Sequence, residues 1–184
     1  MFSVDEKQFI LNLARESIEY YFDNHKLLKI IPSQVPEKLQ AKQACFITLT
    51  INNNLRGCVG HTEPIQSLYL DVVENAVSAA FDDSRFSPLN KEEFDKVKIE
   101  VSILSTPTEL IFSSPEELLK KLRAGIDGVI IQNGNNSATY LPQVWETFPD
   151  KIDFLNSLCE KAGLSADAWK KNSIKVWVYT VEMF

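Results

Sequence analysis

The chain has 184 residues, of which 45% are hydrophobic and 24% are charged, as is ordinary for a soluble globular protein. Its formal net charge of −6 argues against a nucleic-acid-binding protein, because such proteins carry a basic surplus that neutralises phosphates. The length fits a single domain over residues 1–184, or one domain with two lobes.

The elements expected in chain order mix helices with hairpins. They are a helix at 3–22, strands at 44–51 and 55–61, a helix at 64–81, a short helix at 90–97, a strand at 99–104, a helix at 114–125, a hairpin at 128–141, helices at 152–162 and 166–170, and a strand at 174–183. Without a regular strand–helix repeat, this order predicts an α+β fold with mixed, mostly antiparallel sheets.

Local signals support several of these elements. Ser3 and Glu6 form the capping-box pattern of a helix N-terminus. Asparagines at 52–54 predict a turn because asparagine tolerates positive φ. Pro64 suits the first turn of a helix, and Gly125 is expected to end the helix that starts near 114.

The location of the protein is predicted from its N-terminus and its cysteines. The stretch MFSVDEKQFI lacks the basic start and apolar run of a signal peptide, and no stretch of the chain is apolar enough to span a membrane. Cys45, Cys58 and Cys159 are widely spaced and match no zinc-ligand pattern. We therefore expect a cytoplasmic protein with reduced thiols and no metal site.

The segment LRGCVGH, residues 55–61, carries a guanidinium, a thiol and an imidazole. In a strand, Arg56, Cys58 and Gly60 share one face, where Arg56 would favour the nucleophilic thiolate of Cys58. Gly57 and Gly60 would admit a ligand or a neighbouring backbone, and Gly60 is also expected to adopt a backbone conformation that other residues resist. The alternative is a buried structural cysteine, which is the more common state of a free thiol.

His61 lies three residues beyond Cys58 and therefore on the opposite face of a strand. A thiol–imidazole pair is then excluded unless Gly60 bends the chain. The alternative is that His61 simply closes the turn into the next helix.

Two further segments hold candidate residues. Asp83 and Arg85 follow the predicted helix at 64–81, where a carboxylate is disfavoured by the helix dipole and needs a positive partner. The alternative there is a loop salt bridge with Phe86 anchored in the core. Tyr140 leaves the second hairpin and either lines a pocket or anchors the core. Glycine-rich cofactor motifs are absent, so no cofactor is assigned.

The order of several segments resembles the AMMECR family, whose hallmark is an L-R-G-C-[IV]-G stretch, here LRGCVG at 55–60. Five other segments are similar to family motifs: CFITLTINNN, AAFDDSRFSPL, IEVSIL, ATYLPQVW and FLNSLCEKAGLSADAW. Together they cover about residues 5–180 of this sequence. Two departures are visible, since Ala44-Cys45 stands where the family often has glycine and Ser84 where it usually has proline.

The resemblance implies an α+β fold with a larger and a smaller lobe around a cleft near which the shared motifs gather. It also implies a link in prokaryotes to a Memo-like protein and a radical S-adenosylmethionine protein. No reaction comes with the resemblance.

Two functional interpretations follow. In the first, the protein is an enzyme or enzyme subunit that binds a small anionic ligand through its arginines. Its expected residues are Cys58, His61 and Asp83 for catalysis, with Arg56, Gly57, Gly60, Arg85 and Tyr140 for ligand binding. In the second, the same residues form a non-catalytic interaction or assembly module. The first leads, because the shared motifs are polar and loop-borne.

Overall fold

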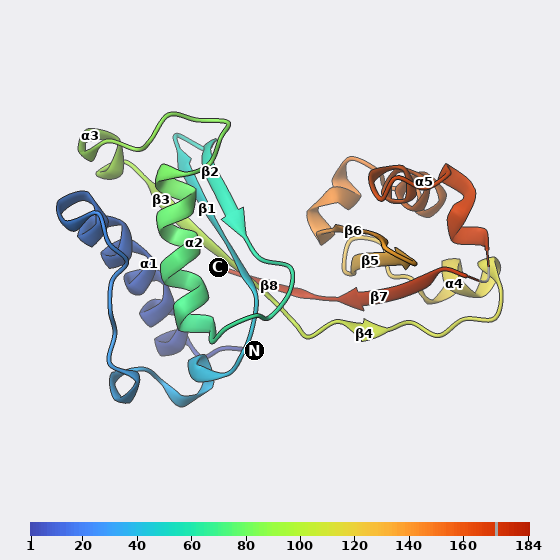
Figure 1. The fold of residues 1–184 in the computed structure, drawn as a ribbon, viewed down its shortest axis with the longest axis horizontal. Coiled ribbons are helices and arrows are strands. Elements are labelled where there is room, and N and C mark those ends of the chain that lie inside the picture. The colour runs from blue at the N-terminus through green and yellow to red at the C-terminus, as the bar shows by residue number, and fades with distance from the viewer. Residues whose placement is uncertain (172) are drawn as a thin grey trace. The chain divides into compact units, whose positions relative to one another are not determined.

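The computed structural model describes residues 1–171 and 173–184, which form two compact units (Figure 1). Unit 1 consists of residues 1–104 and 182–184, and unit 2 of residues 105–181. Each unit contains its own four-stranded sheet and its own hydrophobic core. The predicted α+β fold with antiparallel pairing is therefore confirmed.

Unit 1 packs two long helices against one face of its sheet, whose strand order is β2-β1-β3-β8. Its elements are α1 (Val4–Asn24), 3₁₀ helices at Pro32–Gln34 and Glu37–Gln40, β1 (Cys45–Ile51), β2 (Asn54–Gly60), α2 (Leu68–Phe81), α3 (Lys91–Phe94), β3 (Lys98–Leu104) and β8 (Val181–Met183). Alternate residues of β1, Cys45, Ile47 and Leu49, are fully buried beneath the helices. The opposite face of the sheet carries the intervening residues, so the period-2 pattern sorts the two faces.

The local signals of unit 1 act as the sequence predicts. Ser3 Oγ accepts the Glu6 N–H at 3.2 Å, and the Glu6 carboxylate accepts the Ser3 N–H at 2.7 Å. Asn52 and Asn53 both have positive φ, of 52° and 63°, and form the tight turn between β1 and β2.

The helix expected from Pro64 begins only at Leu68. Backbone hydrogen bonds run from Gln43 to Gln66 and from Leu68 to Ala41, so this stretch pairs with the segment that precedes β1. This non-local pairing holds the residues before Leu68 out of the helix, and a local helix-start signal cannot detect it.

Unit 2 packs two α-helices and short 3₁₀ helices against a sheet of order β4-β7-β5-β6. Its elements are β4 (Thr108–Glu109), α4 (Pro115–Lys121), β5 (Gly128–Asn133), β6 (Asn136–Tyr140), a 3₁₀ helix at Pro142–Glu146, α5 (Lys151–Lys161), a 3₁₀ helix at Ala166–Lys170 and β7 (Lys175–Tyr179). The rings of Trp145 and Phe154 stack in its core with centroids 3.7 Å apart. The hairpin predicted at 128–141 is formed by β5 and β6, and Gly134 has a φ of +59° in the turn between them.

The helix expected to end at Gly125 ends at Lys121 instead. Leu122 is extended and buried in the core of unit 2, and the Arg123 N–H donates to the Asp127 carboxylate at 2.8 Å. Gly125, with a φ of +76°, belongs to the turn that follows.

The last predicted strand is in fact two strands in different sheets. β7 ends at Tyr179 in the sheet of unit 2, and β8 begins at Val181 beside β3. Between them, Thr180 and Ser105 exchange hydrogen bonds: the Ser105 N–H donates to the Thr180 carbonyl and the Thr180 N–H to Ser105 Oγ.

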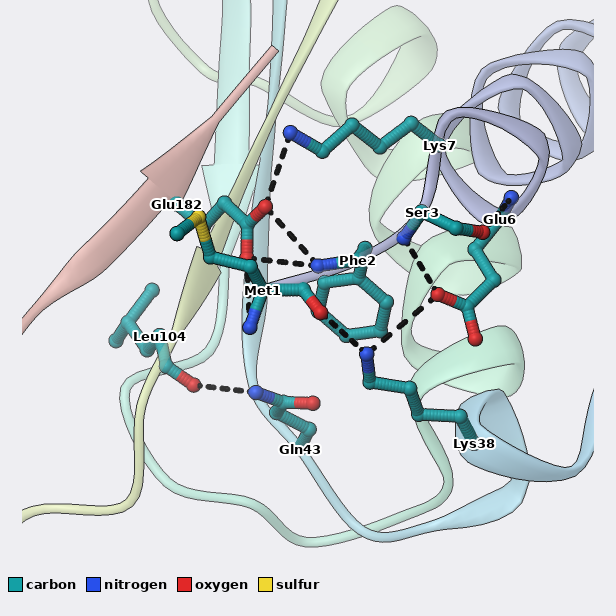
Figure 2. Close-up of polar contacts among 9 residues, drawn as sticks. All are labelled: Met1, Phe2, Ser3, Glu6, Lys7, Lys38, Gln43, Leu104 and Glu182. Atoms are coloured by element: carbon teal, nitrogen blue, oxygen red, sulfur yellow. Dashed lines mark hydrogen bonds and ion pairs between the residues drawn. The ribbon is translucent and has the colours of Figure 1, made fainter.

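Glu182 fixes the C-terminal strand to the first residues of the chain (Figure 2). Its carboxylate accepts the Phe2 N–H at 3.1 Å from each oxygen and pairs with Lys7 Nζ at 2.9 Å. Val101 and Phe184 exchange backbone hydrogen bonds at 2.9 and 3.2 Å, which places β8 beside β3. No helix within residues 1–171 and 173–184 combines the length and the apolar character that crossing a membrane requires.

Candidate functional site

The LRGCVG motif forms β2, a strand at the edge of the sheet of unit 1. Gly57 lies against the backbone of α2, at Ala79. Cys58, the next residue, therefore points to the face of the sheet that α2 does not cover. There the Thr48 hydroxyl donates to Cys58 Sγ at 3.3 Å, and the thiol is partly exposed.

Both glycines of the motif are required by packing. A Cβ at Gly57 would collide with the Ala79 carbonyl oxygen, and a Cβ at Gly60 would collide with the Cys45 carbonyl oxygen and with Phe46. The expected unusual backbone at Gly60 is wrong, because its φ is not positive. The neighbour that excludes a side chain is protein at both positions, and a role of either glycine in ligand binding stays a prediction.

Asp83 and Arg85 form a pair that binds the free edge of β2. Asp83 Oδ2 accepts the Cys58 N–H at 2.8 Å, and Arg85 Nη2 donates to the Cys58 carbonyl at 3.2 Å. Arg85 also donates to both Asp83 oxygens, at 2.9 and 2.7 Å. These hydrogen bonds from the Arg85 guanidinium hold the pKa of the Asp83 carboxyl well below its ordinary value.

Arg56 has its own carboxylate partner. Its Nε and Nη2 donate to the two oxygens of Glu93, each at 3.0 Å, and Nη2 also donates to the Ser87 carbonyl. The hydrogen bonds from Arg56 lower the pKa of Glu93. The guanidinium groups of Arg56 and Arg85 lie 5.8 and 5.5 Å from the ring centre of Phe86, which is outside the buried core clusters, so the predicted anchoring of Phe86 in the core is wrong.

His61 belongs to a network on the helix-covered side of the sheet. Its Nδ1 lies 2.6 Å from Asp71 Oδ1, and Asp71, on α2, has only 1% of its side chain exposed. Asp71 also accepts hydrogen bonds from the Cys45 N–H at 2.8 Å, from Asn75 Nδ2 at 3.0 Å and from Gln66 Nε2 at 3.2 Å. Cys58 and His61 thus point to opposite faces, as the sequence predicts, and form no thiol–imidazole pair.

The sequence analysis missed Asp71 and Asn75. A signal was present, because these polar residues lie four apart within the apolar stretch LYLDVVENAVSAAF and so share one face of the helix. Cys45, which contacts both residues, is fully buried. Burial raises the pKa of its thiol well above the ordinary value, and the negative charge of Asp71 raises it further.

Tyr140 is part of unit 2. Its hydroxyl lies 2.9 Å from Ser157 Oγ, its ring packs edge-on against Phe154, and Lys161 Nζ lies 4.8 Å from the ring centre. Within unit 1 the structure brings together Arg56, Cys58, Asp83 and Arg85, while His61 directly follows β2 and points to the helix-covered side of the sheet. Among the described residues, no cluster of three or more histidine, cysteine or acidic side chains could hold a metal ion.

These observations define the class of the protein: an α+β chain with two antiparallel sheets whose first sheet presents LRGCVG on an edge strand. A family model described as AMMECR1 matches residues 11–184. The chain belongs to the AMMECR1 family, as its motifs predict.

Similar proteins come from several archaea. A protein of Nanoarchaeum equitans is 40% identical over 177 residues, covering 95% of this chain and 97% of its own length. A protein of Pyrococcus abyssi is 40% identical over 183 residues, covering 96% of this chain and 88% of its own. The crystal structure of an uncharacterised protein from Pyrococcus horikoshii has a TM-score of 0.85 and 36% identity, and the match covers 99% of this chain and 92% of that one.

Proposed function

We propose that this chain is an enzyme or enzyme subunit that binds a small anionic ligand at β2, with Arg85 as the anion contact beside the Cys58 thiol. The observation that carries the proposal is that the Arg85 side chain is 54% exposed yet fixed in place by its two hydrogen bonds to Asp83. A guanidinium that is both exposed and already oriented loses little conformational freedom when an anion binds.

The hydrogen bonds of Arg85 leave one donor group available. Within the described part of the chain, all hydrogen bonds of its guanidinium involve Nε and Nη2, so Nη1 can donate to a carboxylate or phosphate oxygen. Arg56 is a poorer contact, because only 11% of its side chain is exposed and Glu93 binds it in the same two-point manner. Since each arginine already faces a carboxylate, we expect weak binding that falls with ionic strength.

The neighbouring groups suggest distinct roles. Cys58 is the candidate nucleophile or redox thiol, since it is partly exposed and accepts a hydrogen bond from Thr48. Asp83 has both oxygens engaged by Arg85 and one by the Cys58 backbone, which supports a positioning role in place of the proton transfer considered from the sequence.

Two further parts of the proposal have separate support. The three free cysteines support a cytoplasmic location, and the family resemblance supports an association with a Memo-like protein and a radical S-adenosylmethionine protein. Co-purification of each partner with the wild-type chain would test the association. The non-catalytic assembly module is favoured by a different observation: both arginines have partners within unit 1, as expected if they only stabilise the fold.

The anion site can be tested with sulfate and inorganic phosphate. We expect either ion to raise the melting temperature of the wild type by mass action and to do so less in Arg85→Gln. Arg123→Gln is the matched control, because Arg123 is also exposed, at 57%, and is paired with a buried aspartate, Asp127. Equal ion-induced shifts in wild type and both variants would refute Arg85 as the contact.

A further inference from the structure

The imidazole of His61 is held from one side and open on the other. Nδ1 faces the buried Asp71 carboxylate, while 33% of the side chain remains exposed. Among the described residues, Nε2 of His61 has no hydrogen-bond partner, so it is the ring nitrogen available to a ligand.

The donors around Asp71 determine which ring nitrogen of His61 carries the proton. The Cys45 backbone N–H, the Asn75 Nδ2–H group and the Gln66 Nε2–H group each donate a hydrogen bond to the carboxylate. These nitrogen groups are donors only, so the carboxylate must be the acceptor in all three. With His61 as a fourth donor, the two oxygens accept the four hydrogen bonds that a carboxylate can take. Asn75 Nδ2 also lies 3.4 Å from Nδ1, but the Asp71 oxygen is much closer, at 2.6 Å, and can only accept. This geometry assigns the proton to Nδ1, which leaves Nε2 of the neutral ring with a free lone pair.

We infer that His61 Nε2 is a proton-accepting site for a ligand with an O–H or N–H group, and that Asp71 is the residue that positions it. On proton transfer, the ligand's O–H or N–H bond breaks, a bond from Nε2 to hydrogen forms, and the bonding electron pair stays on the ligand. The resulting imidazolium keeps its hydrogen bond to the Asp71 carboxylate, which stabilises the positive charge.

The charges nearby select a ligand of a different class from that proposed for Arg85. Glu74 accepts a hydrogen bond from Gln66 at 2.7 Å, so a second carboxylate is part of the same network, and Glu63 is exposed two residues beyond His61. This acidic surrounding disfavours an anion and favours a neutral or cationic ligand, such as an alcohol or an ammonium group. The site follows the end of β2 on the side of the sheet that α2 covers, and it does not depend on anion binding.

The protonated nitrogen can be observed directly, because the chain has only two histidines. In long-range ¹H–¹⁵N spectra at about pH 9, where imidazoles are normally neutral, we expect His61 to carry its proton on Nδ1. His25 is exposed and serves as the internal reference, with the usual preference for Nε2. Protonation of His61 on Nε2 in the wild type would overturn the inference without any variant.

Two variants separate positioning from a general structural effect. In Asp71→Asn we expect the proton of His61 to move to Nε2, whereas Gln66→Ala, which removes another donor to the same oxygen, should leave it on Nδ1. An Asp71→Asn protein that keeps its fold and the Nδ1 proton would show that Asp71 does not position the ring.

Accessibility of Nε2 needs its own probe. Diethylpyrocarbonate acylates an unprotonated imidazole nitrogen, and we expect it to modify His61 in the native wild type and to do so several-fold more slowly in Asp71→Asn. Mass spectrometry of the two histidine peptides measures both rates, with His25 as the reference. Modification of His25 alone would show that Nε2 is closed to ligands and would refute the site. Neither probe is an anion, so these results are independent of the Arg85 test.

Discussion

Gly57 is packed so closely against α2 that the structure leaves no space for a side chain at this position. Because its missing side chain faces the Ala79 carbonyl, we expect Gly57→Ala to lower the free energy of unfolding by overpacking, by about 1–3 kcal/mol. Leu55→Ala, on the same strand but exposed, should change it by less than about 0.5 kcal/mol. Urea unfolding of both variants measures the difference, and a Gly57→Ala protein as stable as the wild type would contradict the close contact.

Cys58 differs from the other two cysteines in exposure. Cys45 and Cys159 are fully buried, and burial raises the pKa of both thiols. We therefore expect iodoacetamide to label Cys58 first in the native protein at neutral pH, as measured by mass spectrometry. Equally slow labelling of all three cysteines would leave Cys58 as a packed thiol and remove it as a candidate nucleophile.

Asp83 should make stability depend on pH in acid. Because the folded-state pKa of its carboxyl is lowered by Arg85, the stability that it contributes is fully present above the unfolded-state pKa of about 3.9 and is lost as the pH falls through the lower folded-state value. The difference in free energy of unfolding between wild type and Asp83→Asn should thus shrink from pH 6 to about pH 2. Asp23→Asn, in an exposed ion pair with Lys91, is the control and should show almost no difference at any pH.

Among single residues, the sequence predicts contacts between side chains that are close together in the chain. Asp83 and Arg85 are two residues apart, so their pairing could be anticipated as one alternative. The attachment of that pair to the Cys58 backbone could not, since it joins positions 25 or more residues apart. Asp71 was missed for the same reason: its partners on other elements, Cys45 and His61, approach it only once α2 packs on the sheet.

Among the elements, β8 depends most on a single side chain. Glu182 links this three-residue strand to the Phe2 backbone and to Lys7 (Figure 2). The N–H groups of Val101 and Phe184 each donate to the carbonyl of the other residue. In Glu182→Ala we expect the hydrogens of both N–H groups to exchange with solvent faster. Glu109→Ala removes an exposed carboxylate from β4 and is the control for the lost charge. Unchanged exchange at both amides would show that pairing with β3 alone holds the strand.

Elements with strong local signals are predicted well, as the capped α1 and the Asn52-Asn53 turn show. The split between β7 and β8 is different, because the alternating pattern continues through Thr180 without interruption. Periodicity identifies the strand but not the sheet that it joins, which depends on distant partners such as Ser105 and Val101.

For the whole molecule, the two separate cores raise the question of whether the units unfold together. All three tryptophans, Trp145, Trp169 and Trp177, belong to unit 2, so their fluorescence reports on that unit. Because the two core clusters share no residue, we expect Gly57→Ala to lower the unfolding midpoint seen by circular dichroism while the fluorescence midpoint stays unchanged. Coincident midpoints in the variant would instead support a single cooperative domain over residues 1–184.

The attachment of Asp83 and Arg85 to β2 has a consequence for how copies of this chain behave at high concentration. An exposed strand edge is a template on which another chain can add a strand. At Cys58 both backbone groups on that edge are occupied, the N–H by a carboxylate and the carbonyl by a guanidinium, as a neighbouring strand would occupy them. The two side chains act as a one-residue substitute for a fifth strand, so the segment that presents the thiol to solvent is also protected against edge-to-edge aggregation.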